Sequence, residues 1–183
     1  MTGAAFSEDE STGPLAGDSL ARSIQRELRS YSTKSISGYE GGPYSMSLLG
    51  VQTNRDGSLG LNTNVLKNSF AVAPKIVDAI FKNQLISDNA EVEVTSIGTN
   101  TEPGSYVITK TGSDYFIDGV QMTANGTLYT SGSGDSNGMV MNIASSDVSS
   151  ANIYYGKSLM TKIDTSLSNF LASSRAGDIQ ALG

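Results

Sequence analysis

The hydrophobic pattern of this 183-residue chain changes its period twice, and this change limits the folds that it can adopt. Near both ends, apolar residues recur every three to four positions, as they do on one face of an α-helix. Over residues 85–155 they alternate with polar residues, as they do in half-buried β-strands. The sequence therefore predicts an α+β fold. Helical segments from both ends are expected to pack together, with a small antiparallel β-domain inserted between them.

A helix is predicted over residues 19–31, with Asp18 as its N-cap. Its apolar residues form one stripe: Leu20, Ile24, Leu28 and Tyr31. Three arginines occupy its other faces: Arg22, Arg26 and Arg29. Such charged runs usually form a solvated flank of a helix, and the alternative is a surface that binds a partner.

A glycine-rich connector over residues 34–47 follows this helix. Residues 46–53 are predicted to be extended, and Asp56-Gly57 between short apolar runs favours a hairpin turn. Two short helices are predicted next, and the second begins at Pro74, whose missing N–H is tolerated in a first helical turn. The apolar residues assigned to these helices are Leu66 and Phe70, then Ile76, Val77, Ile80 and Phe81.

Short strands are predicted throughout the middle region, with a type I′ turn at Asn125-Gly126. The segments are 91–95, 106–109, 115–117, 121–123, 127–129, 139–143 and 152–155. A last helix is predicted over residues 158–173, and Gly177 is expected to mark its stop. Its apolar stripe is Leu159, Ile163, Leu167, Phe170 and Leu171.

Composition excludes several classes of function. The net charge of −6 argues against binding the phosphate backbone of a nucleic acid. No apolar run approaches the roughly 18 residues of a membrane span. The chain contains neither Cys nor His, so disulfides and Cys–His metal sites are impossible. Residues 1–12 lack the pattern of a secretory signal and are predicted to be a disordered acidic leader.

Three short motifs resemble catalytic or nucleotide-binding signatures. Residues 151–158 fit a relaxed phosphate-loop pattern, but the loop is bulky and strand-like, where a phosphate cradle needs compact backbone. Residues 134–138 fit G-x-S-x-G, but no His is present to accept the serine proton. Residues 110–112 read K-T-G without the Ser-x-x-Lys partner. We expect no enzyme and no bound cofactor or metal. The remaining nucleotide-binding hypothesis predicts hydrolysis that Lys157→Ala would abolish.

Two ordered motifs carry a family resemblance. Residues 13–29 read GPLAGDSLARSIQRELR, and residues 49–59 read LGVQTNRDGSL. They resemble the patterns G-x-L-x-G-D-S-T-x-R-x-I/L-Q-x-x-L and I/L-G-I-x-T-x-x-D-G-x-L of the flagellar filament cap family, FliD. Residues 102–108, EPGSYVI, look like a strand opening of flagellar hook and cap proteins. Ser69-Phe70 and Asn62 depart from the family pattern, and the β-rich segment is longer than in common members.

The resemblance implies a C-terminal fragment of a cap protein. Its domains would be 13–84 plus 156–183, helical, and 85–155, the inserted β-domain. A homo-oligomeric ring at the filament tip would promote flagellin folding and polymerisation without catalysis. The expected partners are self, flagellin and the hook–filament junction protein, with no nucleic acid and no membrane insertion. Export through the flagellar type III apparatus would place it outside the cell. Arg22, Arg26 and Arg29 become candidates for an inter-subunit contact.

The alternative function is a surface or host-glycan adhesin module of the flagellum. Its motivation is the polar β-domain and five of its tyrosines: Tyr106, Tyr115, Tyr129, Tyr154 and Tyr155. Aromatic residues in strands are more often packed than displayed. Glycan binding by residues 85–155 alone would separate this function from that of a cap.

Overall fold

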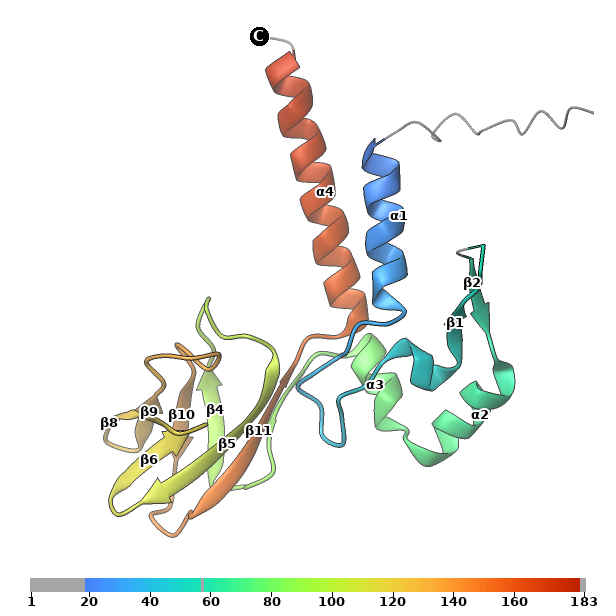
Figure 1. Ribbon diagram of the computed structural model, residues 1–183. Coiled ribbons are helices and arrows are strands. Elements are labelled where there is room, and N and C mark those ends of the chain that lie inside the picture. Colours follow the sequence, from blue (N-terminus) through green and yellow to red (C-terminus); the bar gives the residue numbers. More distant parts are fainter. Residues whose placement is uncertain (1–18, 57, 182–183) are drawn as a thin grey trace, which may run out of the picture.

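The computed structural model describes residues 19–56 and 58–181 of the chain (Figure 1). It contains helices and antiparallel sheets, which confirms the α+β class. The predicted leader, the Asp18 cap and the side chains of Leu20 and Leu28 lie outside the described residues.

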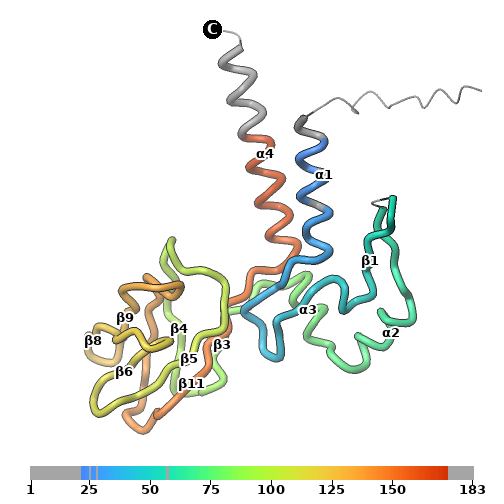
Figure 2. The backbone as a smooth tube through the Cα atoms, viewed as in Figure 1, coloured from blue at the N-terminus to red at the C-terminus, as the bar shows by residue number. Residues whose placement is uncertain are grey.

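Two helices, α1 (Ser19–Tyr31) and α4 (Leu159–Ala181), lie side by side (Figures 1 and 2). α4 runs through Gly177, so the predicted stop there was wrong. A glycine inside a helix costs only about 0.5–1 kcal/mol, which its neighbours can offset. The apolar stripe of α4 is buried only near its start. Leu159 is 1% exposed, whereas Leu171 is 63% exposed.

The connector after α1 folds back on itself through an isolated bridge between Ile36 and Tyr44. A 3₁₀ turn, η1 (Met46–Leu49), follows, where extended chain was predicted. It ends at Gly50, whose φ of 83° is the left-handed conformation that glycine adopts readily. The predicted hairpin is present as β1 (Val51–Thr53) and β2 (Leu59–Leu61).

Helices α2 (Thr63–Val72) and α3 (Lys75–Phe81) follow the hairpin. Asn62 caps α2, because its Oδ1 accepts hydrogen bonds from the N–H groups of Asn64 and Val65. In α3, Ile76 and Ile80 are buried as predicted. Phe81 and the α2 residue Phe70, which the sequence analysis counted among the apolar residues of these helices, are at least half exposed.

The middle region forms two antiparallel sheets. A five-stranded sheet has the order β3-β11-β5-β6-β7, and a four-stranded sheet has the order β4-β10-β9-β8. The strands are β3 (Gln84–Ser87), β4 (Val92–Ser96), β5 (Gly104–Thr111), β6 (Asp114–Ile117), β7 (Val120–Gln121), β8 (Thr123–Asn125), β9 (Leu128–Thr130), β10 (Val140–Ile143) and β11 (Ser150–Gly156).

The β8–β9 turn lies one residue further along the chain than the predicted type I′ turn. Asn125 pairs with Leu128, so the central residues are Gly126 and Thr127. Among the described non-glycine residues only Asp118 has a positive φ, which leaves Gly126, at 65°, as the one left-handed position of this turn. That pattern is typical of type II′, since type I′ needs positive φ at both central residues.

Two groups of buried side chains form the interior. One belongs to the β-rich middle region and is centred on Ile108, Ile117, Met139, Met141 and Ile153. The other joins the connector, η1, α3 and the start of α4, and includes Ile36, Tyr39, Ile76, Ala79 and Leu159. We refer to residues 83–156 as the β-part and to residues 19–82 with 157–181 as the helical part.

Candidate functional site

The three predicted arginines share one face of α1. Their spacing of four and three residues brings them onto adjacent turns of the helix. Arg22 and Arg26 are exposed and Arg29 is half-buried. The Arg26 Nη2 donates a hydrogen bond to the Ser23 hydroxyl at 3.2 Å. We call Arg22, Arg26 and Arg29 the arginine face.

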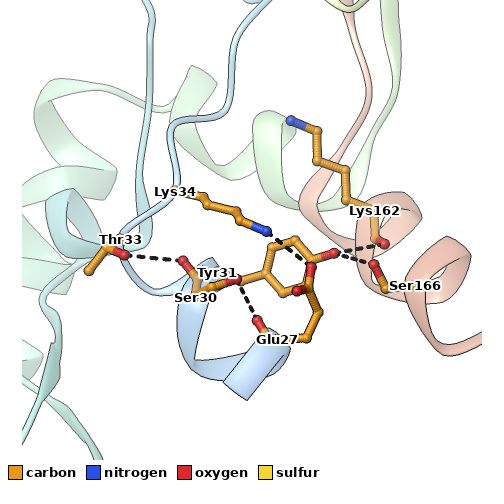
Figure 3. Close-up of polar contacts among 7 residues, drawn as sticks. All are labelled: Glu27, Ser30, Tyr31, Thr33, Lys34, Lys162 and Ser166. Carbon is orange, nitrogen blue, oxygen red and sulfur yellow. Dashed lines mark hydrogen bonds and ion pairs between the residues drawn. The ribbon is translucent and has the colours of Figure 1, made fainter. Parts of the chain in front are cut away.

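The opposite face of α1 packs against α4 (Figure 3). The Tyr31 hydroxyl donates to the Lys162 carbonyl at 3.1 Å and shares a hydrogen bond with the Ser166 hydroxyl at 2.5 Å. Lys34 forms an ion pair with Glu27 at 3.0 Å, and its Nζ lies 4.9 Å from the centre of the Tyr31 ring. With about 3.6 residues per turn, helix geometry places the three arginines on roughly the opposite side of α1 from Tyr31.

Charges around this junction shift two pKa values. The hydrogen bond from Lys34 holds the pKa of the Glu27 carboxyl below its usual range. Burial lowers the pKa of Lys162, and the nearby cations Lys34 and Lys157 lower it further. Three lysines thus lie near one another at the start of α4: Lys34, Lys157 and Lys162.

The β1–β2 hairpin is the neighbour of α1 on its other side. The Ser32 hydroxyl, just after α1, lies 3.1 Å from the Thr53 hydroxyl of β1. Hydrogen bonds from Ser58 are the main cause of a lowered pKa at Asp56 in the hairpin turn, and the positive charge of Arg29 contributes to it. Sequence patterns do not reveal this interaction, because residues 29 and 56 are brought near each other only by the fold of the connector.

The tyrosines that motivated the adhesin alternative are packed. Tyr106, Tyr115 and Tyr155 are buried, and Tyr129 and Tyr154 are half-buried. The Tyr106 hydroxyl donates to the Glu102 and Asp135 carbonyls, and Tyr115 stacks edge-on against Tyr129 at 4.8 Å. The rings of Tyr106, Tyr115, Tyr129 and Tyr155 pack in the interior of the β-part.

The phosphate-loop pattern has a structural explanation. Its loop residues belong to strand β11, and Gly156 lies against the Tyr39 ring so closely that a Cβ there would come within 2.3 Å of the ring. Ser158 caps α4 by accepting a hydrogen bond from the Thr161 N–H at 3.1 Å. The Gly-Lys-Ser run therefore joins a strand to a helix.

A shallow apolar groove lies elsewhere on the helical part. Its volume is about 280 Å³, and η1, α2 and α3 contribute Leu48, Val65, Val72 and Ile76 to its lining. Val72 is 85% exposed, which is unusual for a side chain of this type. The sequence analysis missed this surface, because it identified the two short helices and their apolar residues but not which of those residues stay exposed.

Two classes of site are missing from the part of the chain that the structure describes. It contains no helix with the length and apolar character needed to cross a membrane. It also contains no cluster of three acidic side chains arranged to hold a metal ion.

Comparison with known proteins completes this description. Searches of curated proteins and of solved structures gave no match. The family model described as flagellar hook-associated protein 2 C-terminus matches residues 2–181, which is nearly the whole chain. The chain therefore belongs to this FliD C-terminal family of structural filament cap proteins of the bacterial flagellum.

Proposed function

We propose that this protein works as a subunit of a homo-oligomeric ring at the distal tip of the flagellar filament, where it promotes the folding and polymerisation of flagellin. The observation that carries this proposal is the family match over residues 2–181. The family supports a location outside the cell on the flagellum. Flagellin and the hook–filament junction protein are its proposed partners, and the flagellar type III apparatus is its proposed export route.

Subunit contacts take the role of an active site in this proposal. A cap must hold its neighbours while new flagellin enters beneath it, so its functional surfaces are docking surfaces. The arginine face is our candidate for an inter-subunit contact, because Arg22 and Arg26 are exposed and the three arginines recur on one side of α1. Guanidinium groups suit such contacts because their planar donors can bind a carboxylate at two points.

We also propose a two-domain organisation, with a β-domain over residues 85–155 inserted into a helical domain formed by 13–84 and 156–183. The separate groups of buried residues support it. So does the connection between the parts. The chain leaves the helical part at Asn83 and returns at Ser158, and the Ser158 N–H donates to Asn83 Oδ1 at 2.8 Å.

Genetic complementation tests the cap function. A strain lacking the gene would receive either the intact protein or a variant in which a Gly/Ser linker replaces residues 13–83. We expect normal filaments with the intact protein, and short or absent filaments with unpolymerised flagellin in the medium with the variant. The surface substitution Lys67→Ala serves as a control that should restore filaments, because Lys67 is exposed on α2. Normal filament length and motility in the strain without the gene would overturn the proposal.

A further inference from the structure

The charges of this chain are divided between its two parts. The β-part contains eight Asp and Glu residues and a single Lys. Residues 19–82 contain eight Lys and Arg residues against four Asp and Glu, and residues 157–183 contain three against two. At neutral pH the β-part is thus strongly negative and the helical part is positive. Opposite charges on separate parts of one molecule favour head-to-tail contact between copies.

Two exposed acidic side chains lie on β4 or directly before it. This strand is at the edge of its sheet, and its residues alternate. Val92 and Val94 pack against the interior of the β-part, whereas Glu91, just before the strand, and Glu93 are exposed. Neither carboxylate forms an ion pair with a described Lys or Arg side chain. We call Glu91 and Glu93 the acidic row.

Three other carboxylates of the β-part lie beside groups of their own copy. Asp118 Oδ1 accepts a hydrogen bond from the Val107 N–H at 2.8 Å, and Asp88 is bound to Asn152. Glu102 is next to Pro103, whose carbonyl accepts a hydrogen bond from Ser37 of the same molecule. This last contact sets Glu102 beside the helical part of its own copy.

The acidic row and the arginine face have matching spacing. Residues three or four apart on a helix are about 5–6 Å apart at Cβ. Alternate residues of a strand are about 7 Å apart and point to the same side. Arg26 and Arg29 can therefore each meet one of the two glutamates, and Arg22 extends the row of cations by one turn. No described carboxylate forms an ion pair with Arg26 or Arg29.

We propose that the arginine face of one copy docks on the acidic row of β4 in a second copy of the same chain. The contact joins two different surfaces, so each copy can bind a neighbour on either side and the repeat can close into a ring. This inference rests on the proposed cap function, for which it names the subunit contact.

Charge reversal in the intact chain tests the contact by sedimentation velocity. Glu91→Lys with Glu93→Lys should weaken self-association by about tenfold or more, and so should Arg26→Glu with Arg29→Glu, because two attractive pairs become repulsive. An equimolar mixture of the two variants should recover association, since every neighbouring pair then has opposite charges. Association of the unmodified chain should also weaken from low salt to about 1 M salt, where the Debye length is about 3 Å.

Matched controls separate this contact from an effect of net charge. Glu102→Lys with Asp135→Lys changes the net charge as the acidic-row variant does, and Lys67→Glu with Lys157→Glu matches the arginine variant. Both controls should associate like the unmodified chain. Circular dichroism verifies that each variant is folded. If the arginine variant does not fold, the acidic-row variant and the salt dependence still test the contact.

Four results would overturn the proposal: a monomer at all concentrations, variants that associate normally, controls that weaken association equally, or a mixture that stays dissociated. The first also counts against the proposed ring, whereas the other three leave the cap function open. That is judged by filaments in the complemented strain, so a wrong contact and a wrong function give different results.

Discussion

Tyr31 links the two long helices through its hydroxyl group. Its hydroxyl bonds both the Lys162 carbonyl and Ser166 on α4. Tyr31→Phe should lower the free energy of unfolding by about 1 kcal/mol, because these bonds are lost while the ring remains. Urea unfolding measures the difference. Tyr129→Phe is the control, because no hydrogen bond of its hydroxyl is described, and an equal loss there would contradict this role of Tyr31.

Two buried tyrosines make stability depend on alkaline pH. Burial, with a smaller effect of Asp78, raises the pKa of Tyr39 from 10.0 to about 12. Burial, with smaller effects of Asp135, Asp118 and Glu102, raises the pKa of Tyr106 from 10.0 to about 12. Between pH 10.0 and about pH 12 the unfolded chain loses phenol protons that the folded chain keeps. The free energy of unfolding should therefore fall as the pH rises through this range.

The ultraviolet absorbance of phenolate measures this effect. Two tyrosines should titrate near pH 12, and Tyr39→Phe and Tyr106→Phe should each remove one of them. Stability below pH 10 should not vary with the titration of these two groups. If all tyrosines titrated together near pH 10, the burial of these hydroxyls would be contradicted.

At the scale of elements, the contact between the connector and β11 depends on two glycines. A Cβ on Gly38 would lie 1.8 Å from the Tyr155 carbonyl oxygen, and Gly38 also has a φ of 82°. A Cβ on Gly156 would lie 2.3 Å from the Tyr39 ring. The connector and the strand can approach so closely only because these side chains are missing.

Gly156→Ala should therefore destabilise the fold by about 1–3 kcal/mol through overpacking. Gly132→Ala is the matched control, because a Cβ at that position meets no atom within 4 Å. Chemical denaturation of both variants provides the comparison. Equal stability of the two would show that the junction tolerates the extra methyl group and would contradict the close packing.

Local patterns were sufficient to predict many elements but not their surroundings. Alternation identified β4, β5 and β10, and the Asp56-Gly57 signal identified the first hairpin. β3 was missed, because its exposed Leu85 and Ile86 do not alternate with polar residues. The arginines could be named from their spacing. The effect of Arg29 on the pKa of Asp56 depends on long-range packing, which periodicity does not report.

At the scale of the whole molecule, we expect the β-part to fold alone. Its first and last strands are joined, since Gln84 pairs with Gly156. The buried side chains of its interior also all come from the β-part itself. A fragment of residues 83–157 should show cooperative thermal unfolding and dispersed amide resonances. A spectrum typical of an unfolded chain would show instead that the helical part is needed, and would contradict the two-domain proposal.

The adjacency of Asn83 and Ser158 has a practical consequence for protein engineering. Because the chain leaves and re-enters the helical part at neighbouring points, the β-part resembles a cassette with a single attachment site. A foreign domain with adjacent ends could be grafted there in its place. A new residue would then have to cover the Tyr39 ring, against which Gly156 now packs. Such chimaeras would use the helical part as a scaffold for displaying antigens or enzymes.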